Sequence, residues 1–144
     1  MKKSLFFAFI ALCVTLSLVF AQKKTAAKKS SDVDLTKMSA TMVYAKVFDM
    51  LINPDNYEGR KIRMHGTFEV FEYEMDGKPA RSFACIVQDA TACCAQGMEF
   101  RLKGSPVYPK DYPAQYSDIT VSGTFHQFEE AGMNRILLTD CTVE

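Results

Sequence analysis

The chain has 144 residues, 17 basic and 17 acidic side chains, and a mean hydropathy close to zero at −0.06. This length suits a single domain with one core. Balanced charge lacks the basic field with which nucleic-acid binders hold phosphates, so we expect no nucleic acid among the partners.

The first 21 residues have the pattern of a signal peptide. Lys2 and Lys3 form a positive start, an apolar run extends from Leu5 to Phe20, and Ala21 is a small residue at the cleavage position. A retained anchor is the alternative, but the run is shorter than the ~20 residues that span a membrane. We expect cleavage after Ala21, export to the periplasm or the outside, and membrane contact only through this signal.

Residues 22–33 are polar, rich in lysine and without aromatic side chains, which is typical of a flexible tether. The remaining residues 34–144 are predicted to form one folded domain. Once Lys2 and Lys3 are removed, 15 basic residues face 17 acidic ones, so the exported chain has a net charge of −2.

Residues 35–52 are predicted to be helical because apolar side chains recur at spacings of three and four. Either Asp34 or Thr36 could cap the start of this helix. Asn53 and Pro54 are expected to end it, because proline restricts the residue before it and asparagine favours turns.

The pattern then changes to that of β-strands. Alternation of apolar and polar residues, interrupted by turn residues, predicts strands over 61–74, 80–88, 97–102, 118–128 and 134–142. Asp76-Gly77 is a strong hairpin signal between the first two strands. A long connection rich in proline and tyrosine, residues 103–117, separates the third strand from the fourth.

Two of these strands carry the same motif, I-x-[MV]-x-G-T-F-x-x-F-E, at residues 62–72 and 119–129. A glycine inside a strand marks a bulge or a sharp bend, and a small closed barrel needs such bends at its corners. The fold class is therefore predicted to be mainly β, and the layout resembles a five-stranded Greek-key barrel of the OB type, preceded by one N-terminal helix. A small β-sandwich is the alternative.

Four cysteines follow the signal segment: Cys85, Cys93, Cys94 and Cys141. Exported cysteines usually form disulfides, and thiolates also suit zinc or copper(I). In a metal site, His65 or His126 could add a nitrogen ligand. Redox exchange is a weaker hypothesis because there is no C-x-x-C. If the third and fifth strands are neighbours, as in an OB barrel, all four thiols could approach one region.

Two resemblances bear on these residues. The tract Ala92-Cys93-Cys94-Ala95 resembles the C-terminal domain of a permease-associated family of uncharacterised bacterial proteins, the DUF1980 family. The tract N-P-D-x-Y-x-G-R-x-I-x-M-x-G-x-F, residues 53–68, is similar to small exported bacterial domains. These resemblances imply the fold and the importance of Cys93 and Cys94, but no activity.

Tyr108, Tyr112 and Tyr116 lie in the proline-rich connection. Aromatic side chains on an OB barrel can stack on a ligand, or they can plug the end of the barrel. Glutamates at 69–74 and 129–130 alternate on exposed strands, which indicates solvated charge. No catalytic motif is present, so we expect a binding protein and not an enzyme.

The sequence therefore predicts an exported binding module of the cell envelope that holds zinc or copper(I) through the cysteine cluster. The alternative is a disulfide-stapled OB-fold interaction module that binds a peptide, a glycan or an envelope protein. In either case the partner is an envelope protein or a small ligand.

Overall fold

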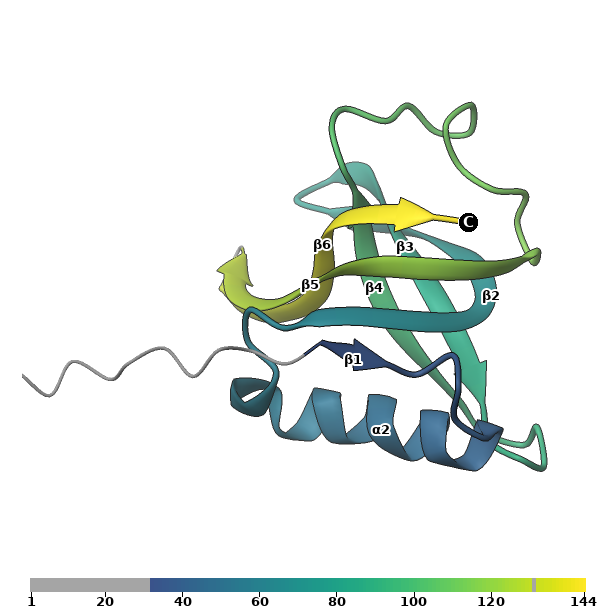
Figure 1. Ribbon diagram of the computed structural model, residues 1–144. Helices are drawn as coiled ribbons and strands as arrows, with labels where there is room; N and C mark the ends of the chain where they lie inside the picture. Colours follow the sequence, from purple (N-terminus) through teal and green to yellow (C-terminus); the bar gives the residue numbers. More distant parts are fainter. Residues whose placement is uncertain (1–31, 131) are drawn as a thin grey trace, which may run out of the picture.

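The computed structural model describes residues 32–130 and 132–144, which form a mainly β protein with one α-helix (Figure 1). The predicted signal segment and almost all of the predicted tether lie outside the described residues. Within the described part, no helix is long and apolar enough to cross a membrane.

Five long strands carry the fold. They are β2 (Lys61–Met75), β3 (Lys78–Gln88), β4 (Ala95–Leu102), β5 (Asp118–Glu130) and β6 (Met133–Val143). Each begins and ends within two residues of the strand predicted from the sequence pattern. A short additional strand, β1 (Val33–Asp34), precedes them, and Val33 is buried in it although the sequence assigned this residue to the tether.

The strands form one sheet in the order β1-β2-β3-β4-β6-β5, and β5 also pairs with β2. This last pairing joins the two sides of the sheet, so that β2 to β6 form a ring. β1 is not part of the ring and pairs with the start of β2. Neighbours are antiparallel except for β4 with β6 and β1 with β2, which run parallel. The sequence-based count of five strands omitted β1.

The repeated motif lies at two corners of the ring. Its two copies pair antiparallel, with Ile62 opposite Gly123 and Gly66 opposite Ile119. The residue after each glycine, Thr67 in β2 and Thr124 in β5, belongs to two ladders at once. β2 thus changes from β5 to β3 at Thr67, whereas β5 pairs with β2 and β6 together from Val121 to Thr124.

Glycine is required at both corners because the adjacent strand comes very close. A methyl group at Gly66 would overlap the carbonyl oxygen of Ile86 and lie 2.8 Å from Cys85 Sγ. A methyl group at Gly123 would overlap Cys141 Sγ and lie 2.9 Å from the carbonyl oxygen of Thr139. Each corner thus packs against a cysteine of the following strand.

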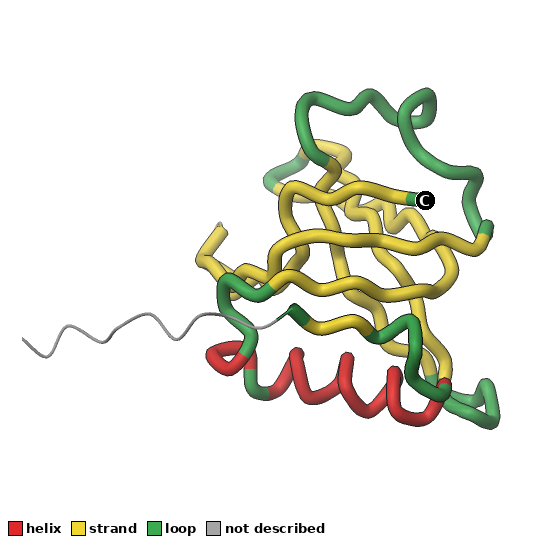
Figure 2. The backbone as a smooth tube through the Cα atoms, in the orientation of Figure 1, coloured by secondary structure: helices red, strands yellow, loops and turns green. Residues whose placement is uncertain are grey.

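Apolar side chains from every strand fill the ring, led by three phenylalanines that are fully buried: Phe68, Phe100 and Phe125. The helix α2 (Ala40–Ile52) lies across one end of the ring and packs on β3 and β4 (Figure 1). Its spacing buries Val47 and Met50, one turn apart. The loop 103–117 arches over the other end (Figure 2).

The helix begins later than the sequence pattern predicts, and the expected caps are wrong. Leu35 lies before the helix, and its N–H donates to the carbonyl of Arg63 at 2.8 Å. The Asp34 carboxylate accepts bonds from the N–H and hydroxyl of Thr36 instead of capping a helix. This local turn favours non-helical backbone, and the helix starts only after Ser39. The short 3-10 helix η1 (Pro54–Asn56) follows it, in agreement with the predicted stop.

Candidate functional site

The loop between β3 and β4 is built around the side chain of Asp89. Its Oδ1 accepts hydrogen bonds from the N–H groups of Thr91 (3.2 Å) and Cys93 (3.1 Å). The backbone N–H of Asp89 donates to the carbonyl of Cys94 at 3.0 Å. A short carboxylate side chain is suited to such bonds with nearby backbone groups. The loop therefore folds around one carboxylate, with both cysteines beside it.

Three groups that ligate metals converge here, those of Asp89, Cys93 and Cys94. We call the segment that carries them the thiol loop. Their ligand atoms all lie within 4.8 Å of one another, and no other group of this kind occurs among residues 32–130 and 132–144. The two sulfurs are 3.6 Å apart, and Cys93 Sγ is 3.4 Å from Asp89 Oδ2. Both cysteines are exposed, so solutes can reach them.

The charges of the thiol loop differ from one ligand to the next. Burial alone would raise the pKa of Asp89, but hydrogen bonds from Cys93, Thr91 and the backbone together hold this pKa below its usual value. The pKa of Cys94 is raised, first by its hydrogen bond with Cys93 and then by desolvation and the Asp89 charge. At neutral pH the loop therefore combines an ionised carboxylate with a protonated Cys94 that a metal ion could deprotonate.

The structure does not bring the four cysteines together, which corrects the expectation of one cluster. Cys85 precedes the end of β3 by three residues, or ~10 Å along the strand. β4 and β6 are neighbours as expected, but their parallel register places Cys141 beside Leu102. That position is seven residues beyond Ala95, roughly 23 Å from the thiol loop.

Cys85 and Cys141 are part of the core. They are 0% and 2% exposed, and burial raises the pKa of each thiol to about 12. A buried thiol of this kind is a poor nucleophile and a poor metal ligand. All four described cysteines are free thiols, so the structure contains none of the expected disulfides among them. The reason is geometric, since each buried sulfur faces a glycine and not a second sulfur.

The two histidines do not join the thiol loop. His65 Nδ1 lies 3.3 Å from the Thr120 hydroxyl, and His126 Nδ1 lies 2.6 Å from Glu58 Oε1. His65 lines the same hollow of about 410 Å³ as Asp89, but it is outside the cluster of metal-ligating atoms. The idea that a histidine supplies a ligand therefore has no support from these contacts.

The three tyrosines divide into two kinds. Tyr112 stacks on Phe83 with ring centroids 4.1 Å apart, and Tyr108 packs at 5.5 Å from the same ring. Tyr112 also packs partly buried against the core, and the choice between plugging the ring and stacking on a ligand stays a prediction. Tyr116 is separate from them, with 68% of its surface exposed.

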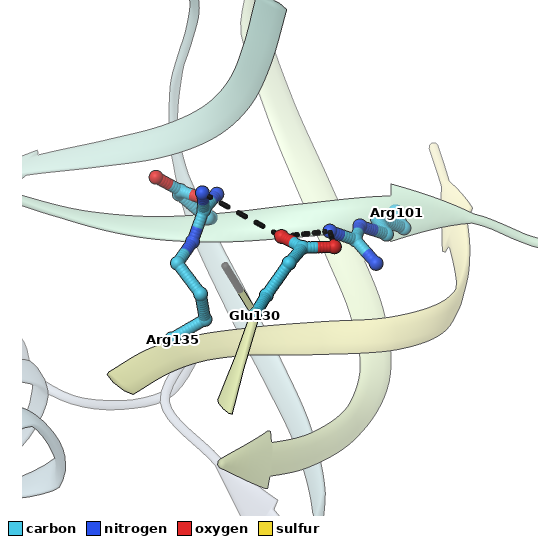
Figure 3. A network of polar contacts seen from close by, with 4 residues as sticks. Arg101, Glu130 and Arg135 are labelled. Carbon is cyan, nitrogen blue, oxygen red and sulfur yellow. Dashed lines mark hydrogen bonds and ion pairs between the residues drawn. The ribbon is translucent and has the colours of Figure 1, made fainter. Parts of the chain in front are cut away.

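The sequence pattern did not indicate a network of arginines and glutamates that links β4, β5 and β6 (Figure 3). Glu130, at the end of β5, reaches between Arg101 on β4 and Arg135 on β6. It accepts two bonds of 3.0 Å from Arg101 Nη2 and lies 3.7 Å from Arg135 Nη1. Arg135 also pairs with Glu99. Because partners on different strands meet here, spacing along the chain gave no signal of these ion pairs.

Comparison with known protein families, with curated proteins and with solved structures finds no match to this chain. The two resemblances drawn from the cysteine tract and from residues 53–68 therefore stay predictions.

Proposed function

We propose that this chain is an exported binding module of the cell envelope that holds a soft metal ion, zinc or copper(I), in the thiol loop. The observation that carries the proposal is the convergence of two exposed thiols and a carboxylate within 4.8 Å. The expected signal peptide and the net charge of −2 support export and argue against nucleic acid as the ligand.

The separation of the sulfurs suits a shared metal ion. Zinc–sulfur bonds of ~2.3 Å at a tetrahedral angle place two sulfurs about 3.8 Å apart, and Cys93 and Cys94 hold theirs at 3.6 Å. Only small movements of the side chains would complete the geometry. A disulfide would require the sulfurs to approach to ~2.05 Å, which strains the peptide between adjacent cysteines.

The ligand set favours exchange of the metal over a purely structural role. Structural zinc sites have four protein ligands, whereas sites that react keep a position open. The thiol loop offers three ligands at the surface, so water or a partner's ligand would occupy the fourth position. Because the thiols must lose protons to bind, we expect the affinity for zinc to increase as the pH rises from about 6 to 8.

The fold that we propose for this module is a five-stranded OB barrel. The ring order β2-β3-β4-β6-β5 and the close packing at two mid-strand glycines support this proposal. The helix that often connects the third and fourth strands of that fold is replaced by the loop 103–117. β1 and α2 are additions at the N-terminal side.

Native mass spectrometry of the protein from an oxidising compartment, before and after a chelator, tests the metal proposal. We expect one metal ion per chain that the chelator removes and that neither Cys93→Ser nor Cys94→Ser retains. Cys141→Ala is the matched control and should retain it. A metal-free mass with a Cys93–Cys94 disulfide, or a metal ion unaffected by both serine variants, would overturn the proposal.

A further inference from the structure

A second binding site, independent of the metal, lies where β3 and β4 diverge. The ladder between these strands runs from Gln88 opposite Ala95 to Ala84 opposite Glu99 and stops there. Beyond it, the strands, β6 and the loop 103–117 enclose a hollow of about 370 Å³. This volume is in the range of sites for small molecules.

Three guanidinium groups line this hollow, and each of them also pairs with a glutamate. Three arginines, Arg81, Arg101 and Arg135, face it together with one acid, Glu99. Glu99 and Tyr73 hold Arg135 in place. The hydrogen bond with Tyr73 is the main cause of the raised pKa of Arg135. A charge-bearing side chain that is only 15% exposed and held from two sides presents a rigid wall to a ligand.

Two of the arginines retain unused donors. Arg81 donates from Nε to Glu72 at 2.7 Å, and Arg101 donates from Nη2 to Glu130. Among the described residues, no protein acceptor meets the Nη atoms of Arg81 or the Nε and Nη1 atoms of Arg101. A guanidinium group with free N–H donors is the preferred partner of a carboxylate, because its planar fork matches the two oxygens.

Part of the lining is aromatic, and Arg81 lies close to it, 5.3 Å above the ring of Tyr108. Phe83 and Tyr112 are stacked at 4.1 Å with an angle of 26° between their planes, and both line the hollow. Flat apolar faces of this kind accept the C–H face of a sugar ring. Ser82 and Glu99 add hydrogen-bonding groups, and a hydroxyl of a sugar can both donate to a carboxylate and accept from an arginine.

We propose that this hollow binds a sugar that carries a carboxylate, with the acid on Arg81 and Arg101 and the ring against the Phe83–Tyr112 stack. The size of the hollow, the N–H donors left on its arginines and its aromatic wall all fit this class of ligand. The site does not depend on the thiol loop, which lies at the other end of the β3–β4 ladder.

Isothermal titration calorimetry of the purified protein with D-galacturonate, D-galactose and acetate tests the proposal. We expect galacturonate to bind at least tenfold more tightly than the neutral sugar or the bare carboxylate. Equal binding of acetate would overturn the sugar component, and equal binding of galactose would overturn the acid component. The absence of any galacturonate binding at millimolar concentration would overturn the whole proposal.

Two substitutions and a control locate the site. Arg101→Gln and Arg81→Gln should each weaken galacturonate binding at least tenfold, and circular dichroism should show that both variants remain folded. Arg63→Gln is the control, because Arg63 pairs with Glu144 and lies outside the lining. An effect of the control equal to that of Arg101→Gln would place the ligand elsewhere. Binding that survives in the Cys93→Ser variant would show independence from the metal, and its loss there would contradict it.

Discussion

Two pairs of cysteines in the same small domain lie in opposite environments. Cys85 and Cys141 are buried in the core, and the sulfur of each packs closely against a corner glycine. Cys93 and Cys94 are exposed and lie beside a carboxylate. The difference arises from position alone. At an inward-facing strand position, a thiol packs as part of the core. In the loop that folds around Asp89, a thiol is exposed and can act as a ligand.

Thiol reactivity should separate the two pairs most strongly. We expect a thiol reagent such as iodoacetamide to modify Cys93 and Cys94 at least a thousandfold faster than Cys85 and Cys141. The buried thiols react only after local or global opening, which costs several kcal/mol. Peptide mapping by mass spectrometry after timed alkylation measures each site. Labelling of Cys85 at the rate of Cys93 would contradict the described burial.

Substitution of the corner glycines tests how closely the two buried cysteines are packed. Gly66→Ala and Gly123→Ala should each lower the free energy of unfolding by about 3 kcal/mol, because the new methyl group overlaps a neighbouring strand. Denaturant unfolding measures this loss, and a double-mutant cycle separates its causes. Cys141→Ala should recover part of the loss at Gly123, where sulfur is the main obstacle. Cys85→Ala should recover little at Gly66, where the carbonyl of Ile86 remains.

Alkaline pH should act through the buried pair. The pKa of both thiols is raised from 9.0 to about 12, so the folded state binds more protons than the unfolded state between these values. Stability is therefore fully present below pH 9 and is lost as the pH rises towards 12, by ~1.4 kcal/mol per pH unit for each thiol. Thermal unfolding from about pH 8 to about pH 10.5 should reveal this slope. Cys141→Ala should reduce the slope, and an unchanged slope would exclude Cys141 as its source.

Substitutions in the thiol loop should have the smallest effect on stability. Cys93→Ser and Cys94→Ser remove exposed side chains outside the core, so each should change the free energy of unfolding by less than about 0.5 kcal/mol in metal-free protein. The same denaturant unfolding measures this change. A loss as large as that of a core cysteine would mean that the loop supports the fold and not only a ligand.

Local patterns were sufficient to predict most of the fold. Alternation located all five long strands, and Asp76-Gly77 marked the first hairpin, because strand and turn preferences act over a few residues. The start of α2 was missed because Asp34 has two suitable partners, a helix terminus or the nearby Thr36, and its hydrogen bonds go to Thr36.

The candidate sites were less accessible to sequence reasoning because they depend on register between distant strands. The adjacency of β4 and β6 was predicted, but whether Cys141 lies beside Ala95 or beside Leu102 depends on a parallel register that no local motif encodes. The role of Asp89 depends on hydrogen bonds to backbone groups of the folded loop, which no sequence pattern indicated. The meeting of Arg101, Glu130 and Arg135 from three strands has the same non-local origin.

The pairing that closes the ring has a kinetic consequence. β2 meets β5 between residues that are 51 to 63 positions apart in the chain, whereas the β2–β3 and β5–β6 hairpins join near neighbours. Contacts between distant residues carry the larger entropic penalty of loop closure. The two hairpins should therefore form early, and the docking of one motif copy against the other should limit the rate of refolding. Conservative truncations at Met64 and Val121, which pair at the centre of that ladder, would then mainly slow folding, whereas truncations elsewhere would mainly speed unfolding.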